Sequence, residues 1–164
     1  MVQQQVIDNN EFHPIDREAT VQAVKSFFSD RECYDGYNYQ ELKRMSGAWR
    51  ELKSPSLNTL GGLASGTNNT VEWRFIKHTE CSRAIQAVEY AIHGCDRVSR
   101  EILMKRYIEQ RPVKIVRDIL QIAGNATWHR LDQRACCQFA ECMEAAAILY
   151  RTDQRLFPQL QFYL

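Results

Sequence analysis

The clearest pattern in this sequence lies in its last third, where a short apolar segment, a turn and a long amphipathic segment follow one another. Residues 113–120 are rich in Val, Ile and Leu, and Gly124-Asn125 separates them from a long stretch without Pro or Gly. In that stretch, hydrophobic side chains recur every three or four positions, the spacing of one helix face. The members of this stripe are Trp128, Leu131, Ala135, Phe139, Cys142, Ala146 and Leu149. The pattern predicts a helix-turn-helix whose second helix buries the stripe.

The opposite face of the second helix carries side chains that suit contact with DNA. Arg, Gln, Asn and Thr have donors and acceptors that match the edges of bases, and Arg and Lys also bind phosphates. On this face we predict DNA contacts by Asn125, Thr127, His129, Arg130, Gln133 and Arg134. Phosphate contacts are predicted for Arg111, Lys114 and Arg117. The alternative interpretation is a solvated polar face, which is common on amphipathic helices.

The distribution of charge favours the DNA-binding interpretation. Residues 97–134 contain nine Lys or Arg and four Asp or Glu, a local net charge of +5, whereas the whole chain has a formal net charge of +1. Positive charge is therefore concentrated at the predicted helix-turn-helix, where it can neutralise phosphates and make binding sensitive to salt.

The first part of the chain, residues 1–53, is predicted to form an N-terminal helical region. One helix is predicted to start after Asp16, a suitable N-cap, and its apolar face consists of Val21, Val24, Phe27 and Phe28. A second helix is predicted over residues 39–53, with Ser46-Gly47 as a point where it can kink and Pro55 after its end. The apolar positions of this second helix are Leu42, Met45, Trp49 and Leu52.

Residues 54–69, "SPSLNTLGGLASGTNN", contain three glycines and several turn-forming residues, and they predict a linker loop. The next segment, residues 70–94, predicts a helix with a heptad seam, because a series of mostly apolar positions, with Arg and His near its start, alternates spacings of three and four. The seam consists of Val71, Arg74, His78, Cys81, Ile85, Val88, Ile92 and Cys95. It can pack inside the domain or pair with a second copy of the chain in a homodimer.

A further helix is predicted over residues 97–109, with Asp96 or Ser99 as its cap and Pro112 starting the short helix that follows. Its inward positions are Val98, Ile102, Leu103 and Tyr107. Residues 70–150 thus form the predicted DNA-binding region. The tail, residues 151–164, contains Leu156, Phe157, Leu160, Phe162 and Leu164, and it either folds back onto the body or contacts a partner. No segment has a strand pattern, so the predicted fold class is all-α.

Composition and motifs exclude several classes of protein. The chain has no run of about 18 apolar residues and no signal-peptide pattern at its start, so neither a membrane protein nor an exported one is expected. Six cysteines are present without a C-x-x-C pair. His78, Cys81, His93 and Cys95 can donate to metals but lack zinc-site spacing, so we expect reduced core cysteines and no metal. Common catalytic motifs are also absent. The sequence therefore predicts a cytoplasmic protein without enzymatic activity or cofactor.

Several stretches of the sequence resemble the ArpU (autolysin regulatory protein) family of Gram-positive bacteria and their phages. "HPIDREATVQAVKSFF" is similar to the family's opening, an Ile-Asp pair and a Thr before an amphipathic helix. "YNYQELKRMSG" resembles its second helix, and "SPSLNTLGGLASGTNNTVEW" resembles its linker. "ILMKRYI" and "TWHRLDQRACCQFAE" resemble its C-terminal motifs, which are themselves similar to region four of bacterial sigma factors.

This resemblance implies a regulator of late genes in phages and prophages, with double-stranded DNA as its ligand and RNA polymerase as a partner. It implies that Trp128 is buried, and that the residues facing DNA are Asn125, His129, Arg130 and Arg134. The chain departs from the family at the turn, where the usual spacing would put Gln121 at an apolar position. The turn is one residue longer than usual if Leu120 is the core residue.

Two functions follow from the sequence. The first is a sequence-specific DNA-binding transcriptional regulator, an activator of phage or prophage late genes in the cytoplasm of a bacterial host. One recognition helix reads only a few base pairs, so this function calls for a homodimer or a second contact with RNA polymerase. The alternative is a helical protein-interaction module, an anti-repressor or polymerase adaptor, that makes no contact with DNA.

Overall fold

The computed structural model describes residues 14–31, 33, 35–47 and 68–164. In these residues it contains six α-helices and no β-strand, which confirms the all-α class. The helices are α1 (Arg17–Phe28), α2 (Tyr39–Ser46), α3 (Asn68–Gly94), α4 (Arg97–Ile102), α5 (Val113–Leu120) and α6 (Asn125–Leu149). A π-helical stretch, Leu103–Ile108, continues α4, and a short 3-10 helix covers Gln154–Leu156.

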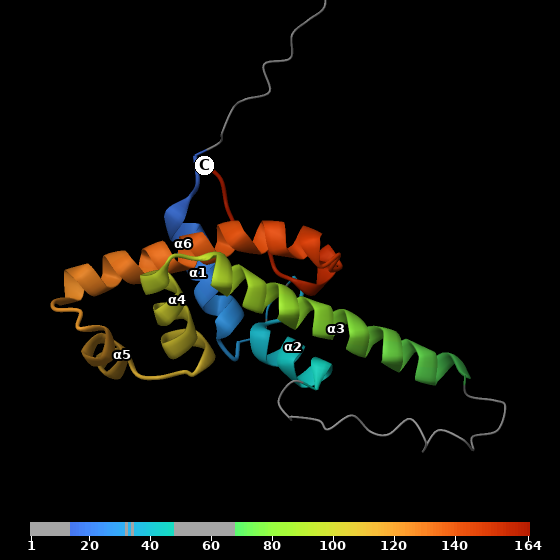
Figure 1. Cartoon of the computed structure of the whole chain (residues 1–164). Helices are drawn as coiled ribbons and strands as arrows, with labels where there is room; N and C mark the ends of the chain where they lie inside the picture. The colour runs from blue at the N-terminus through green and yellow to red at the C-terminus, as the bar shows by residue number, and fades with distance from the viewer. Residues whose placement is uncertain (1–13, 32, 34, 48–67) are drawn as a thin grey trace, which may run out of the picture.

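The two long helices, α3 and α6, pack against each other and form the frame of the fold (Figure 1). Helix α1 and helix α4 pack on α6, and α2 packs on α3. Helix α5 lies at the end of the molecule where α6 begins, and the first half of α3 projects beyond the other helices. The core lies where α1, α3 and α6 meet, and Val24, Val88 and Phe139 are fully buried there.

Helix α1 starts where the sequence predicted, because Asp16 caps it. The Ala19 backbone N–H donates to Asp16 Oδ1 at 3.0 Å, which satisfies one of the free donors at a helix start. The predicted apolar face is confirmed as buried: Val21, Val24, Phe27 and Phe28. Phe28 and Phe139 lie with ring centroids 5.0 Å apart, so aromatic contacts join α1 to α6.

Helix α2 begins at a capping box and ends earlier than predicted. The Glu41 backbone N–H donates to Asn38 Oδ1 at 2.8 Å, and the Asn38 N–H donates to Glu41 Oε2 at 2.9 Å. The helix ends at Ser46 because Gly47 has a φ of 72°, a left-handed conformation that stops a helix. The prediction of one helix over residues 39–53 is therefore wrong at Gly47, and its positions Trp49 and Leu52 lie outside the described residues.

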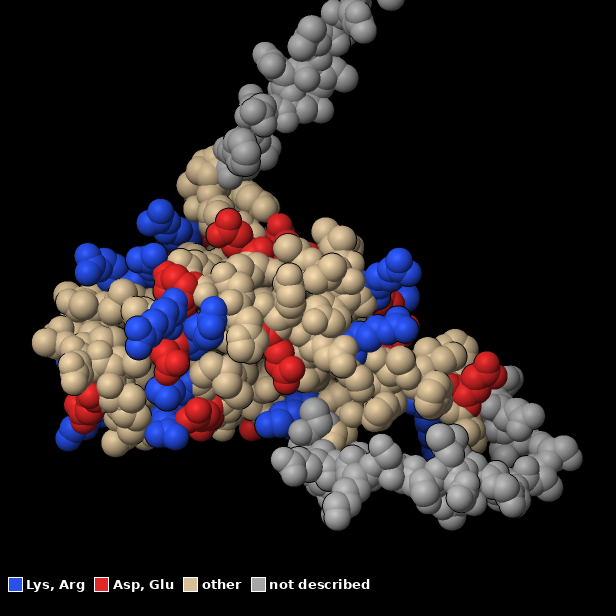
Figure 2. Space-filling view, viewed as in Figure 1, with Lys and Arg blue, Asp and Glu red and all other residues tan. Residues whose placement is uncertain are grey.

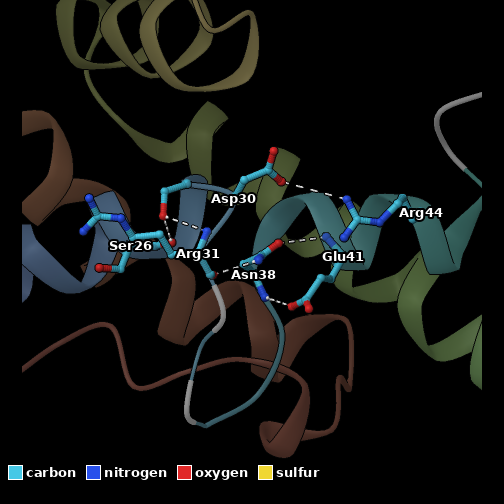
Figure 3. A network of polar contacts seen from close by, with 7 residues as sticks. Ser26, Asp30, Arg31, Asn38, Glu41 and Arg44 are labelled. Carbon is cyan, nitrogen blue, oxygen red and sulfur yellow. Dashed lines mark hydrogen bonds and ion pairs between the residues drawn. The ribbon is translucent and has the colours of Figure 1, made fainter.

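Polar contacts also fix the connection between α1 and α2 (Figure 3). The Asn38 side-chain amide donates to the Arg31 carbonyl at 3.0 Å, so the cap of α2 also holds the chain that leaves α1. Arg44 Nη1 lies 3.9 Å from Asp30 Oδ1 on the exposed surface beside it. These contacts hold the chain that leaves α1 beside α2.

Helix α3 begins at Asn68, two residues before the predicted start, and the rest of the predicted linker, residues 54–67, lies outside the described residues. The heptad seam divides into two halves. Its second half is buried within the chain, and consists of Cys81, Ile85, Val88, Ile92 and Cys95. Its first half, Val71, Arg74 and His78, is exposed. Packing within the molecule thus explains the second half of the seam only.

The C-terminal tail folds back onto the helices, one of the two outcomes expected from its apolar residues. Leu156 and Leu160 are buried, and the tail pairs with the start of α1 through an isolated bridge between Ile15 and Tyr163. The tail also passes close to Gly36, where a Cβ atom would lie 2.6 Å from the Phe157 carbonyl carbon. Leu164, in contrast, remains 79 % exposed.

The buried face of α6 is wider than the predicted stripe. Four further residues are buried beside it: Asp132, Cys136, Ala140 and Met143. Leu149 is 60 % exposed, so its predicted burial is wrong because the helix end extends beyond the core. Val98 on α4 is also exposed rather than inward. None of the helices in the described part of the chain is long and apolar enough to cross a membrane.

Candidate nucleic-acid interface

The segment from α4 to α5 leads into the candidate interface. Asp96 is the cap of α4, since its Oδ1 accepts from the Ser99 backbone N–H at 2.9 Å, while Ser99 itself is buried. The π-helical stretch then carries the chain to Glu109, and Gln110, with a φ of 54°, turns it toward α5. π-Helical turns are rare and often lie at functional sites. Pro112, predicted to start the short helix, is the residue immediately before α5, which begins at Val113.

A four-residue connection, Gln121–Gly124, joins α5 to α6. Gln121 ends α5 in a left-handed conformation, with a φ of 55°, and Gly124 precedes α6 with a φ of 84°. Glycine is needed here for its backbone angle and not for lack of space, because an added Cβ would meet no atom within 4 Å. Leu120 packs against the core while Gln121 is exposed. Leu120 is therefore the core residue, and the turn is one residue longer than in the family.

One arginine spans this connection. Arg117 Nη1 donates to Asn125 Oδ1 at 2.6 Å, and Arg117 Nε donates to the Ile122 carbonyl at 3.5 Å. The guanidinium thus contacts the connection and the first residue of α6 together. Arg117 and Asn125 were predicted to contact DNA separately, but the structure brings their side chains together.

The other predicted contacts lie on two surfaces. On α6, the outer face of the first half exposes His129, Arg130, Gln133 and Arg134. Thr127 is half-buried. Near α5, Arg111 and Lys114 are exposed, and Arg111 is paired with Glu109. Two apolar side chains of α5, Ile115 and Ile119, are also exposed, because only Val116 of this helix is fully buried.

A buried carboxylate on the inner face fixes the orientation of α6. Asp132 Oδ2 lies 2.9 Å from Lys25 Nζ, and Asp132 Oδ1 accepts from the Tyr107 hydroxyl at 2.7 Å. Burial raises the pKa of Tyr107, and the neighbouring Cys136 and Asp132 raise this pKa further. One side chain thus joins α1, the π-helical stretch and α6. Nothing in the sequence indicated this role beyond an acid placed next to the apolar stripe.

An ion pair on the outer side connects α6 to α4. Arg134 Nη2 lies 2.7 Å from Asp96 Oδ2, and the Gln138 side-chain amide donates to the same oxygen at 2.8 Å. The hydrogen bond from the Ser99 backbone is the main cause of the lowered pKa of Asp96, and Gln138 and Arg134 lower this pKa further. Asp96 therefore partly neutralises one of the predicted DNA-contacting arginines.

The outer face remains cationic beyond this pair. Lys and Arg side chains gather over the first half of α6 (Figure 2). A groove of about 460 Å³ runs along this face, and its lining includes Arg17, Arg130, Gln133, Arg134 and Glu141. Arg17 comes from the start of α1. Sequence reasoning missed this residue, because nothing in the local pattern places α1 beside the outer face of α6.

Comparisons with protein-family models, curated proteins and solved structures find no match to this chain. The resemblance to the ArpU family therefore stays a prediction from the sequence.

The six cysteines are all free thiols. Cys81, Cys95 and Cys136 are buried, and burial is the main cause that raises the pKa of Cys95 and of Cys136 to about 12. In the described part of the chain, no group of three or more His, Cys, Asp or Glu side chains could hold a metal ion.

Proposed function

We propose that the protein binds double-stranded DNA with the outer face of α6 and regulates transcription. The observation that carries this proposal is the exposed row His129, Arg130, Gln133 and Arg134 on a helix whose opposite side is buried. An α-helix fits the major groove of B-DNA, where Arg and Gln side chains can reach the edges of bases. A polar row alone would also suit solvent, but the concentration of Lys and Arg around it favours a polyanion.

Rigid placement of α6 supports the same proposal. Sequence-specific contacts need side chains on a helix that does not move relative to its support. Trp128 and Asp132 lock one side of the helix, and Arg117 holds its first residue. Arg111, just before α5, and Lys114, in its first turn, are exposed, and we assign phosphate contacts to them. Arg117 contributes by positioning Asn125.

More specifically, we propose from the resemblance to the ArpU family that the protein is a cytoplasmic activator of phage or prophage late genes. A single helix contacts only a few base pairs, so specificity requires a second contact, with another copy of the chain or with RNA polymerase. The exposed apolar residues Ile115 and Ile119 on α5, next to the cationic face, favour a protein partner bound beside the DNA.

The test is footprinting of the purified protein on the DNA around its own gene, followed by gel shifts on the protected sequence. The double variant Arg130→Ala, Arg134→Ala should lose specific binding, by at least about ten-fold, while keeping the helical circular-dichroism spectrum. Arg83→Ala is the matched control, since Arg83 is exposed on α3, outside the cationic groove. If the double variant binds as tightly as this control, α6 is not the DNA-binding element.

A second candidate function is the protein-interaction module without DNA contact. It is favoured by the first half of α3, where Trp73 is 69 % exposed and Phe75 is 71 % exposed. Val71 and Ile76 of the same segment are exposed as well, and a group of large exposed apolar side chains is typical of a binding surface. The two functions differ in their response to salt, because DNA binding weakens steeply as salt rises and an apolar contact does not.

A further inference from the structure

Helix α1, from the N-terminal part of the chain, forms one wall of the groove on the outer face of α6. Arg17, the first residue of α1, lines it together with Arg130 and Arg134 of α6. Arg17 also lies close enough to Cys137, further along α6, to influence the pKa of that thiol. The groove therefore combines basic side chains from two regions that the sequence separates.

The charge of this groove suits an anion. Three guanidinium groups line it against one carboxylate, that of Glu141. Arg134 is paired with Asp96, whereas neither Arg17 nor Arg130 makes an ion pair with any residue in the described ranges. Cations that share a groove repel one another, and bound phosphates offset this repulsion.

The backbone around Arg17 is held in place. The preceding N–H, that of Asp16, donates to the Phe162 carbonyl at 2.8 Å, and the Phe162 N–H donates to Thr20 Oγ1 at 3.1 Å. The C-terminal tail thus fixes the first turn of α1 from outside. A fixed backbone lowers the entropy lost when the side chain binds, which favours a positioned contact over a freely moving surface charge.

The position of Arg17 along α6 suits a second phosphate. Its neighbour Cys137 follows Arg130 by two helical turns, a separation of about 10 Å along the axis. The phosphates of each DNA strand follow one another at about 3.4 Å along the DNA axis, so a separation of about 10 Å is larger than the spacing of neighbouring phosphates. Arg17 and Arg130 can therefore contact different phosphates of one duplex.

We propose that Arg17 binds a backbone phosphate of the DNA that α6 contacts, so that α1 takes part directly in DNA binding. This inference rests on the proposed function. It makes the N-terminal region part of the interface rather than a support for it. Its ligand is the sugar–phosphate backbone, so Arg17 adds affinity and fixes orientation but reads no base.

The test measures the salt dependence of binding by the full chain to a fluorescein-labelled duplex of random sequence. Binding to such DNA depends on phosphate contacts, and each contact contributes about 0.9 to the slope of log affinity against log salt. Arg17→Gln should lower the slope by about this amount and weaken binding several-fold at low salt. Arg17→Lys, which keeps the charge, should stay near the wild-type slope. Arg83→Ala should match the wild type.

The outcomes separate this inference from the proposed function. If Arg130→Ala weakens binding while Arg17→Gln behaves like Arg83→Ala, the inference about Arg17 is overturned and the DNA-binding function stands. If the wild-type chain does not bind the duplex, or if Arg130→Ala binds as tightly as wild type, both are overturned. Thermal melting of each variant checks folding, and Arg17→Lys supplies a folded comparison whose affinity should exceed that of Arg17→Gln.

Discussion

Arg117 of α5 donates a hydrogen bond to the side chain of Asn125, the first residue of α6, with 2.6 Å between Nη1 and Oδ1. The two helices are joined by a connection of four residues, and this bond closes it from the side. The consequence is a fixed entry point for α6, the helix to which we assign DNA binding.

The first prediction concerns this bond. Arg117→Ala should lower the free energy of unfolding by about 1 kcal/mol, the usual net contribution of a hydrogen bond, because solvent weakens the charge of this exposed bond. Asn125→Ala should cost less, because Asn125 is exposed. Urea denaturation of both single variants and the double variant gives the coupling energy. A coupling of zero would show that the bond does not hold the helices together in solution.

The second prediction concerns Asp96, which neutralises part of the candidate interface. Asp96→Asn keeps a side chain that caps α4 but removes the charge beside Arg134. We expect tighter binding to random-sequence DNA and a steeper salt dependence than in the wild type. Anisotropy titrations at several salt concentrations measure both. Glu89→Gln, at an exposed position on α3, is the matched control for loss of one acidic charge.

The same carboxylate predicts how stability depends on pH. Folding lowers the pKa of Asp96, so its contribution is present at neutral pH and is lost as the pH falls through the folded pKa. The wild type should therefore exceed Asp96→Asn in stability near neutral pH by at most about 1 kcal/mol, because the side chain is one-third exposed. The difference should disappear in strong acid. Denaturation across this range measures it, and a difference independent of pH would contradict the assignment.

The third prediction concerns the buried carboxylate. Asp132→Ala should lower the free energy of unfolding by about 3 kcal/mol, because it leaves Lys25 and the Tyr107 hydroxyl without their shared partner. Adding Lys25→Met to this variant should recover part of the loss, since it removes the uncompensated charge. Chemical denaturation at neutral pH measures each step. Equal stability of the two variants would contradict this account, because it would show that Lys25 carries no cost once Asp132 is gone.

The fourth prediction concerns cysteine chemistry. A thiol with a pKa of about 12 is almost wholly protonated at pH 8, so Cys95 and Cys136 should react slowly with iodoacetamide in the folded protein. The half-buried Cys142 should react sooner. Labelling followed by peptide mass spectrometry ranks the sites, and the buried thiols should become reactive in urea. Rapid labelling of Cys136 without denaturant would contradict its burial.

The sequence predicted the features of the fold that depend on residues close together in the chain. Asp16 marks the start of α1 because a cap acts on the next few residues, and the stripe from Trp128 to Ala146 identifies the buried side of α6. The end of α2 was missed although Gly47 had been noted, because a glycine permits a left-handed angle without requiring it. Periodicity on the following residues suggested a longer helix.

The contacts that depend on tertiary structure could not be predicted in this way. In the sequence, Asp132 was only one of the four acids of residues 97–134, and its burial depends on Lys25 and Tyr107, which other elements supply. Arg17 likewise joins the cationic groove only because α1 packs on α6. The outward row of α6 could be listed from helical geometry. The neighbours of this row, including Asp96, could not be listed in this way, because they depend on how α4 packs against α6.

The pairing of the tail with the start of α1 bears on the order of events during synthesis. The Asp16 N–H finds its backbone partner in Phe162, so α1 receives one of its contacts from a segment that is synthesised much later. Contacts between such distant parts of a chain slow folding, since a long loop must close first. Until residue 162 has left the ribosome, the Asp16 N–H therefore lacks this hydrogen-bond partner, and the native arrangement is reached only afterwards.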